Sequence, residues 1–138
     1  MVGELVYFPD GLIGFTSFKY FILKKSTVFT PYYKLISIED TEVNFLLINP
    51  YLVVPDYVFD IDDNVKNKLD TYLKENLLQF VIVTVPDELE LISINLRMPI
   101  LINDYNNRGH QLLLGEQYPI KLYILYKFNE LKENLLKK

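Results

Sequence analysis

The sequence contains no cysteine, no tryptophan, no alanine and only one histidine among its 138 residues. The absence of cysteine excludes disulfides, thiol catalysis and cysteine-based metal sites. No apolar run approaches the roughly 20 residues that a membrane-spanning helix needs. The first residues also lack the charged start and apolar core of a signal peptide. We therefore expect a cytoplasmic protein without a membrane segment.

A basic surface is also missing. The chain carries 18 acidic and 14 basic residues, which gives a formal net charge of −4, and it has no long basic run before its tail. Direct binding of nucleic acid is therefore disfavoured, because such proteins present clustered lysine and arginine. The charge favours a basic protein partner instead.

Short apolar segments separated by turn residues are abundant, and they are rich in strand-favouring residues, including 11 tyrosines and 9 phenylalanines. This pattern predicts a single domain covering residues 1–138 with an all-β fold, either a barrel or a sandwich. The expected strands are residues 4–8, 20–23, 32–38, 43–48, 79–85, 91–97, 100–102 and 110–114.

Residues 43–57 combine a dense apolar run with two prolines. Pro50 and Pro55 cannot donate to a ladder, so the strand should end near Asn49 and the chain should then be redirected twice. Residues 43–48 and 79–85 do not alternate, which predicts cover on both faces. Residues 91–97 do alternate, which predicts one wet face carrying Ser93, and Pro99 predicts a bulge or sheet corner.

Turn signals divide these strands. Gly11 and Gly14 are expected to be turn glycines, because no phosphate-loop lysine and serine or threonine follow in register. Residues 39–41 and 103–109 predict hairpin loops.

Two helices are expected. A short one near residues 62–75 has one apolar face, with Asp60 or Asp62 available as the cap. The second begins at about residue 126, where Phe128, Leu131 and Leu135 recur at helical spacing, and forms a C-terminal extension.

Residues that could carry catalysis are few. The single histidine, His110, is expected on the surface of a hairpin and lacks a recognisable partner acid. Asp56, Asp60, Asp62 and Asp63 form an acidic cluster without the ligand order of a calcium loop. A helix cap with a solvated loop, or a dock for a basic partner, explains this cluster. A small hydrolase that uses His110 and the acids is a further alternative, and we expect no metal and no cofactor.

Five ordered motifs resemble the FliW family of flagellar assembly factors over nearly the whole chain. Residues 8–15 (FPDGLIGF) are similar to FPxGIPGF, and residues 49–57 (NPYLVVPDY) to NPF followed by PDY. Residues 93–103 (SINLRMPILIN) resemble TVNLxAPIVIN, and residues 108–111 (RGHQ) resemble RxGxQ. Tyr118 with Lys121 resembles the closing motif, and residues 83–86 (VTVP) stand at the matching place.

The resemblance implies an all-β, antiparallel and barrel-like fold. It also implies a non-enzymatic protein that binds flagellin and sequesters CsrA, an RNA-binding repressor of flagellin translation. The two partners would exchange on the protein, and a dedicated flagellin chaperone that does not bind CsrA is the alternative. We expect a monomer when the protein is free. Three differences from the family pattern predict altered packing at a sheet edge: only seven residues before Phe8, Met98 in place of alanine, and a longer tail beyond Lys121.

The predicted partner-binding residues lie in and after the second motif, where the acidic cluster follows the two prolines. They are Asn49, Pro50, Tyr51, Pro55, Asp56, Tyr57, Asp60, Asp62 and Asp63.

Overall fold

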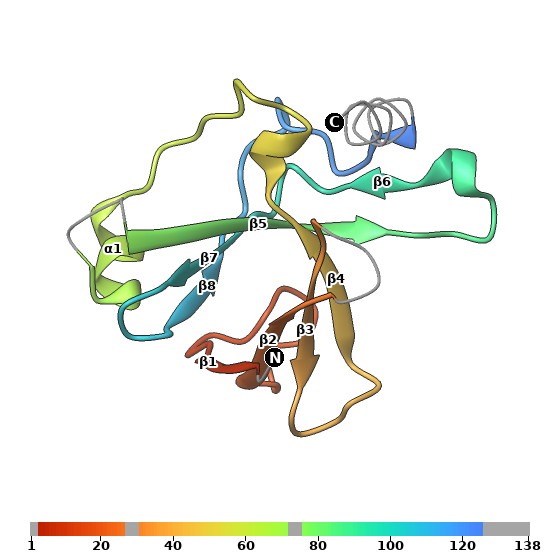
Figure 1. Cartoon of the computed structure of the whole chain (residues 1–138). Coiled ribbons are helices and arrows are strands. Elements are labelled where there is room, and N and C mark those ends of the chain that lie inside the picture. The colour runs from red at the N-terminus through yellow and green to blue at the C-terminus, as the bar shows by residue number, and fades with distance from the viewer. Residues whose placement is uncertain (1–2, 27–30, 72–75, 126–138) are drawn as a thin grey trace, which may run out of the picture.

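The computed structural model describes residues 3–26, 31–71 and 76–125, and they form a mostly antiparallel β fold (Figure 1). Within these residues there are nine strands, one α-helix and two short 3₁₀ helices. In chain order they are β1 (Glu4–Tyr7), β2 (Tyr20–Lys25), β3 (Tyr33–Ser37), β4 (Asn44–Ile48), η1 (Pro50–Leu52), α1 (Asp63–Leu69), β5 (Leu77–Thr84), η3 (Leu89–Leu91), β6 (Ser93–Ile94), β7 (Ile100–Asn103), β8 (Gly109–Gln111) and β9 (Leu122–Tyr123).

The strands pair in the order β1-β2-β3-β4-β5-β6-β9, and β7 and β8 branch from β5. The prediction of a mostly β, antiparallel fold is confirmed. The predicted barrel is not, because this order is open at both ends. A single isolated bridge between Tyr7 and Arg108 links β1 with the β8 branch, and the Tyr7 amide donates to the Asn107 carbonyl at 3.0 Å.

The break predicted at Pro99 divides the strands that pair with one edge of β5. On β5 the paired residues Phe80 and Val83 are three positions apart. Their partners on the opposite chain, Ile100 and Ile94, are six positions apart. Three extra residues are therefore accommodated before Ile100, and the Asn95 carboxamide oxygen accepts hydrogen bonds from the amides of Arg97 and Met98 there. This bulge moves β7 into a second sheet.

Two hydrophobic cores lie on opposite faces of β4 and β5. The inner core, enclosed by the curved sheet, contains Val6, Phe8, Leu12, Phe21, Leu23, Leu35, Leu47, Phe80, Ile100 and Ile102. The outer core is formed between the other face of β4 and β5 and residues after η1 and after β8, including Tyr57, Phe59 and Ile124. The predicted cover on both faces of these two strands is therefore confirmed.

Alternation in residues 91–97 led to a wrong expectation at Ser93. The structure forms η3 at the start of this run and only the two-residue strand β6 after it. β6 lies between β5 and β9, a strand that was not predicted, and Ser93 is buried. The wet face is thus confined to the partly exposed Asn95 and Arg97.

Helix α1 starts where it was predicted, because the Asp62 carboxylate accepts a hydrogen bond from the Val65 amide at 2.9 Å. It ends earlier than expected, since Asp70 adopts the left-handed conformation with φ 53° and closes the last turn. Residues 72–75 and the predicted C-terminal helix from about 126 lie outside the described residues. In the described part of the chain, no helix is long and apolar enough to cross a membrane.

The lack of a side chain at Gly109 allows the motif at residues 108–111 to pack against the motif at residues 8–15. A Cβ added there would lie 2.4 Å from the Phe8 ring, which is fully buried in the inner core. Gly11 meets a different requirement, because its φ is 67° and it closes the turn after Phe8. Gly14 also has positive φ, so the expectation of turn glycines is confirmed.

We expect Gly109→Ala to lower the free energy of unfolding by about 1–3 kcal/mol, the usual cost of overpacking a core. Urea denaturation measures this loss. Gly115→Ala is the matched control, because its added Cβ meets only the flexible end of exposed Gln117 and should cost much less. Equal stability of the two variants would contradict the role given to Gly109.

Candidate partner-binding surface

Residues 49–62 connect β4 to α1 and lie over the outer face of the sheet (yellow in Figure 1). The Asn49 side chain accepts a hydrogen bond from the Tyr51 amide at 2.9 Å and caps η1. Pro50 follows at the first position of that helix, where its missing N–H costs nothing, and it is buried. Asn49 and Pro50, at the start of the second motif, therefore turn the chain sharply at the end of β4.

Tyr57 anchors the same segment. Its hydroxyl donates to the Leu96 carbonyl at 2.6 Å, and burial strongly raises the pKa of that hydroxyl. Its ring packs against Tyr51 at 6.0 Å, Phe59 at 5.2 Å and Tyr118 at 5.8 Å between ring centres. The Tyr118 hydroxyl donates in turn to the Val58 carbonyl. These contacts join the second, third and closing motifs into one aromatic cluster.

Tyr51 is only partly buried and reaches the sheet. Its hydroxyl hydrogen-bonds the Gln79 carboxamide oxygen at 2.7 Å, and burial raises the pKa of Tyr51 despite that bond. A cavity of about 290 Å³ lies between Asn49, Tyr51 and the start of β5. The cavity lies beside two of the predicted site residues, Asn49 and Tyr51.

The acidic cluster is arranged by simple alternation after Pro55. Tyr57, Phe59 and Ile61 point into the outer core, whereas Asp56, Asp60 and Asp62 are exposed. This alternation of side chains is typical of an extended chain that packs one side on a core. Asp62 caps α1 and Asp63 lies in its first turn, where negative charge meets the positive end of the helix.

The nine predicted site residues thus divide into two groups. Pro50 and Tyr57 are buried, Tyr51 is partly buried, and these three fix the path of the chain. The exposed group presents one amide, one proline ring and the four carboxylates to solvent. Its members are Asn49, Pro55, Asp56, Asp60, Asp62 and Asp63.

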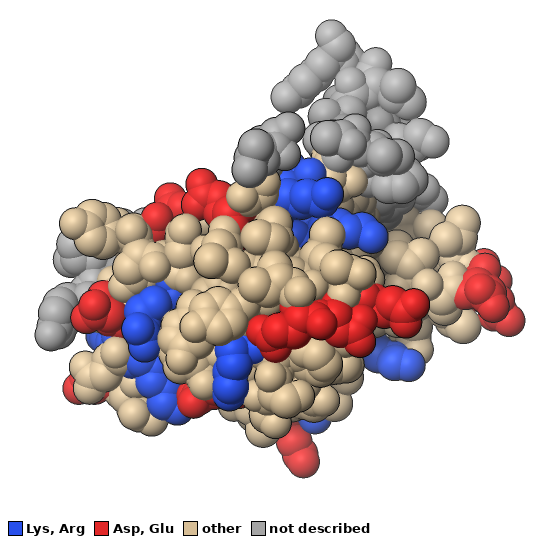
Figure 2. Space-filling model, turned by 90° about the horizontal axis from the view of Figure 1, so that it is seen from below, with Lys and Arg blue, Asp and Glu red and all other residues tan. Residues whose placement is uncertain are grey.

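A second acidic region was not predicted as functional. Glu39, Asp40 and Glu42 are exposed in the hairpin loop between β3 and β4. Figure 2, which views the end of the molecule that carries this hairpin, shows acidic side chains gathered in a band across it. The Glu39 carboxylate accepts a hydrogen bond from the Tyr20 amide at 3.0 Å, so part of this charge fixes the hairpin to β2. Position in a short polar loop was the only sequence signal.

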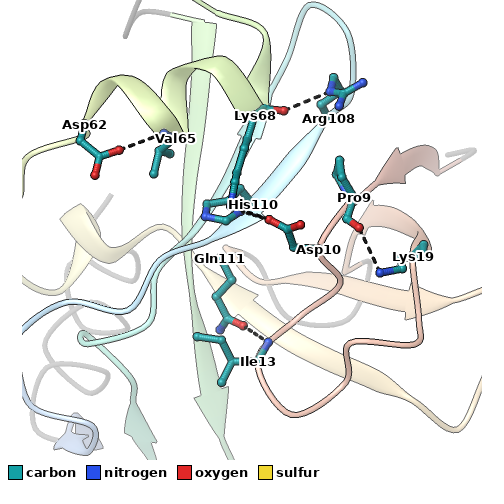
Figure 3. Close-up of polar contacts among 10 residues, drawn as sticks. All are labelled: Pro9, Asp10, Ile13, Lys19, Asp62, Val65, Lys68, Arg108, His110 and Gln111. Carbon is teal, nitrogen blue, oxygen red and sulfur yellow. Dashed lines mark hydrogen bonds and ion pairs between the residues drawn. The ribbon is translucent and has the colours of Figure 1, made fainter.

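His110 lies at a junction of three elements (Figure 3). Asp10 bonds Lys68 of α1 at 2.9 Å, and the same carboxylate oxygen lies 3.6 Å from Nδ1 of His110. The His110 side chain is only 14% exposed, which corrects the expected surface position. Burial, aided by the charge of Lys68, lowers the pKa of His110. The hydrolase alternative would pair His110 with the acidic cluster, but the carboxylate 3.6 Å from its ring is that of Asp10, and Asp62 of the cluster acts on His110 only through its charge.

Gln111 joins three motifs that are far apart in the sequence. Its carboxamide oxygen accepts a hydrogen bond from the Ile13 amide at 2.8 Å, which Figure 3 shows. Its carboxamide nitrogen donates to the Met98 carbonyl at 3.1 Å. Beside it, Arg108 donates to the Lys68 carbonyl at 3.1 Å. The motif residues therefore contact each other. Much of the sequence similarity thus lies in residues that hold the fold together.

The described residues contain no group of three histidine, aspartate or glutamate side chains placed to hold a metal ion. The candidate site is instead a charged surface segment held on an aromatic cluster. Fold and site together define the class: a small, mostly antiparallel β protein that presents an acidic connecting segment on one side of its sheet.

Comparison with known proteins identifies the family. The FliW protein family model matches residues 2–124. The flagellar assembly factor FliW of Caldicellulosiruptor bescii is 36% identical over 127 residues, which cover 91% of this chain and 83% of that protein. The FliW of Caldanaerobacter subterraneus is 39% identical over 124 residues, covering 88% and 83%. A crystal structure of the flagellar assembly factor FliW superposes with a TM-score of 0.81 at 32% identity, covering 88% of this chain and 85% of that one. The chain belongs to the FliW family.

We expect Tyr57→Phe to lower the free energy of unfolding by about 1–3 kcal/mol, because the Leu96 carbonyl loses its buried partner while the ring packing remains. Chemical denaturation measures the change. Tyr105→Phe is the control, since Tyr105 is 89% exposed and should be neutral. A neutral Tyr57→Phe would show that water replaces the lost hydroxyl.

The lowered pKa of His110 predicts a pH dependence of stability. The unfolded chain binds the proton near the ordinary pKa of 6.5, before the folded chain does, so stability falls as the pH drops through this value. His110→Gln should remove this part of the slope between pH 7 and 5. Unfolding free energies measured across that range for both proteins test it, and parallel curves would refute it.

Proposed function

We propose that this protein is a non-enzymatic, cytoplasmic flagellar assembly factor that binds flagellin and also sequesters the translational repressor CsrA. Binding of CsrA would relieve repression of flagellin synthesis. When flagellin accumulates it would displace CsrA, so that repression follows the supply of unexported flagellin. The protein acts through exchange of partners and needs no cofactor.

Membership of the FliW family, over residues 2–124, is the observation that carries this proposal. The relatives are flagellar assembly factors by name. One feature of the surface fits the CsrA half of it. A protein that binds RNA presents clustered positive charge, and residues 56–63 expose four carboxylates on a segment packed on the outer core.

The exposed members of the predicted site are therefore proposed as the CsrA-binding surface: Asn49, Pro55, Asp56, Asp60, Asp62 and Asp63. Pro50, Tyr51 and Tyr57 support it from below. Asp62 has a double role, because its side chain also caps α1. A charge reversal at Asp62 would thus confuse loss of binding with loss of helix stability.

The test is a titration of the purified protein with CsrA, followed by addition of flagellin. Release of CsrA as flagellin binds supports the exchange. Binding of flagellin without any complex with CsrA would instead assign the protein as a dedicated flagellin chaperone. Binding of neither partner would refute the proposal.

We expect the double variant Asp56→Lys with Asp60→Lys, which leaves α1 untouched, to weaken CsrA binding by about tenfold or more and to make the affinity less dependent on salt. Calorimetric titration at low and high ionic strength measures both effects. Asp87→Lys with Glu88→Lys is the matched control, because it makes the same charge change in the exposed turn after β5. Equal losses of CsrA affinity in the two double variants would show that net charge alone weakens binding. Unchanged binding would mean that the carboxylates of residues 56–63 serve only the start of the helix.

A further inference from the structure

The outer face of the sheet is covered unevenly. Over β4 and β5 it is buried in the outer core, where Leu46, Val81 and Val83 pack under the segment after η1. Over β1, β2 and β3 the same side of the sheet is left open by the described residues. The inward residues there, Val6, Phe21 and Leu35, are fully buried, so the alternate positions must face outward.

Those outward positions are apolar and align in two rows across three strands. In the first row, Leu5 pairs with Ile22, and Ile22 pairs with Ile36. The second row contains Tyr7 opposite Tyr20, with ring centres 4.9 Å apart, and Ile38, whose amide donates to the Tyr20 carbonyl. We call these six residues the β1–β3 outer face.

The β1–β3 outer face is substantially exposed. Leu5 is 49% exposed, Tyr20 43% and Ile38 52%, and the other three members are partly buried by their neighbours. Phe8 and Phe21 of the same two segments are buried in the inner core, whereas Tyr20 is exposed and Tyr7 only partly buried. A contiguous apolar patch of this kind on a soluble protein commonly marks an interaction site.

The charged rim of the face is basic on two sides. Lys24 and Lys34 are directly opposite each other in the next row, and both are exposed. Like charges in such a pair repel, and the ion pairs of the described residues involve neither lysine. At the β1 edge, the Arg108 guanidinium lies 5.7 Å from the centre of the Tyr7 ring. The end near Tyr20 and Ile38 is acidic, because Glu39, Asp40 and Glu42 are exposed in the hairpin loop there, and the Glu39 carboxylate accepts hydrogen bonds from backbone amides.

The size of the face suits one helix. Three adjacent strands span roughly 10 Å, and the two rows are separated by about 7 Å along the strands. An α-helix is about 10–12 Å wide and repeats every 5.4 Å, so two or three successive turns can cover both rows and reach the lysines. A second copy of this chain fits less well, because stacking two such faces brings four exposed lysines into one interface.

We propose that the β1–β3 outer face docks an amphipathic helix of flagellin, with the apolar stripe of the helix on the two rows and its acidic residues against Lys24 and Lys34. This inference rests on the proposed function. The assignment to flagellin follows from charge. The exposed carboxylates of residues 56–63 suit CsrA, which is basic because it binds RNA, whereas the lysines beside the β1–β3 outer face would repel it. Flagellin is therefore the partner assigned to this face. The protein would then hold its two partners on surfaces of opposite charge.

The apolar part of the proposal is tested with the double variant Leu5→Ser and Ile38→Ser. We expect its affinity for purified flagellin to fall by about tenfold or more, while affinity for CsrA stays within about twofold. Leu113→Ser with Val85→Ser is the matched control, because both residues are exposed and apolar but lie outside the face. Thermal unfolding of each variant verifies the fold.

The charged rim is tested with Lys34→Glu, against Lys121→Glu as an exposed lysine elsewhere. Lys34→Glu should weaken flagellin binding by several-fold and make it less sensitive to salt, and Lys121→Glu should do neither. Unchanged flagellin affinity in both the serine and the glutamate variants of the face overturns the proposal. Loss of CsrA binding instead overturns the assigned partner. Absence of any complex with the unmodified protein refutes the proposed function itself.

Discussion

Burial of both faces of β5 is the constraint on which the rest of the fold depends. Its residues alternate between the two cores, with Val81 and Val83 on the outer side and Phe80 and Ile82 on the inner side. A strand that is apolar on both faces is stable only if each face is covered. The curling of β1 to β4 covers one face, and the connecting segment before α1 covers the other. One side of that segment covers the outer core, and its other side, which faces solvent, is the candidate surface.

Features set by neighbouring residues could be predicted from the sequence, and features set by distant pairing could not. The unalternating runs predicted burial on both sides of β4 and β5, and Pro99 predicted the bulge, because both depend on local chain chemistry. β9 has two residues, and it forms only because Ser93 and Ile94 offer a ladder some thirty residues away. The open order of the sheet likewise follows from pairing across the chain. At Asp70 a left-handed turn overrode a helical pattern that continued beyond it.

The candidate site was partly predictable for the same reason. Asp62 as a cap and Pro50 as the end of a strand follow from the chemistry of single residues. The burial of Tyr57 depends on Leu96 and Tyr118, which the sequence does not place beside it. The two rows of the β1–β3 outer face are invisible until the register is known, since Leu5 and Ile36 belong to unremarkable strands and meet only through Ile22.

The hydrogen bond between Gln111 and the Ile13 amide spans 98 residues of sequence, and this separation has a consequence for folding during synthesis. The loop after β1 can meet Lys68 through Asp10 once α1 has emerged from the ribosome, but its second attachment is still missing then. Long-range contacts of this kind form late. The inner core therefore remains unsealed around Phe8 and Leu12 until β8 has been made, and a nascent chain that stalls before residue 111 would leave both side chains accessible to chaperones and proteases.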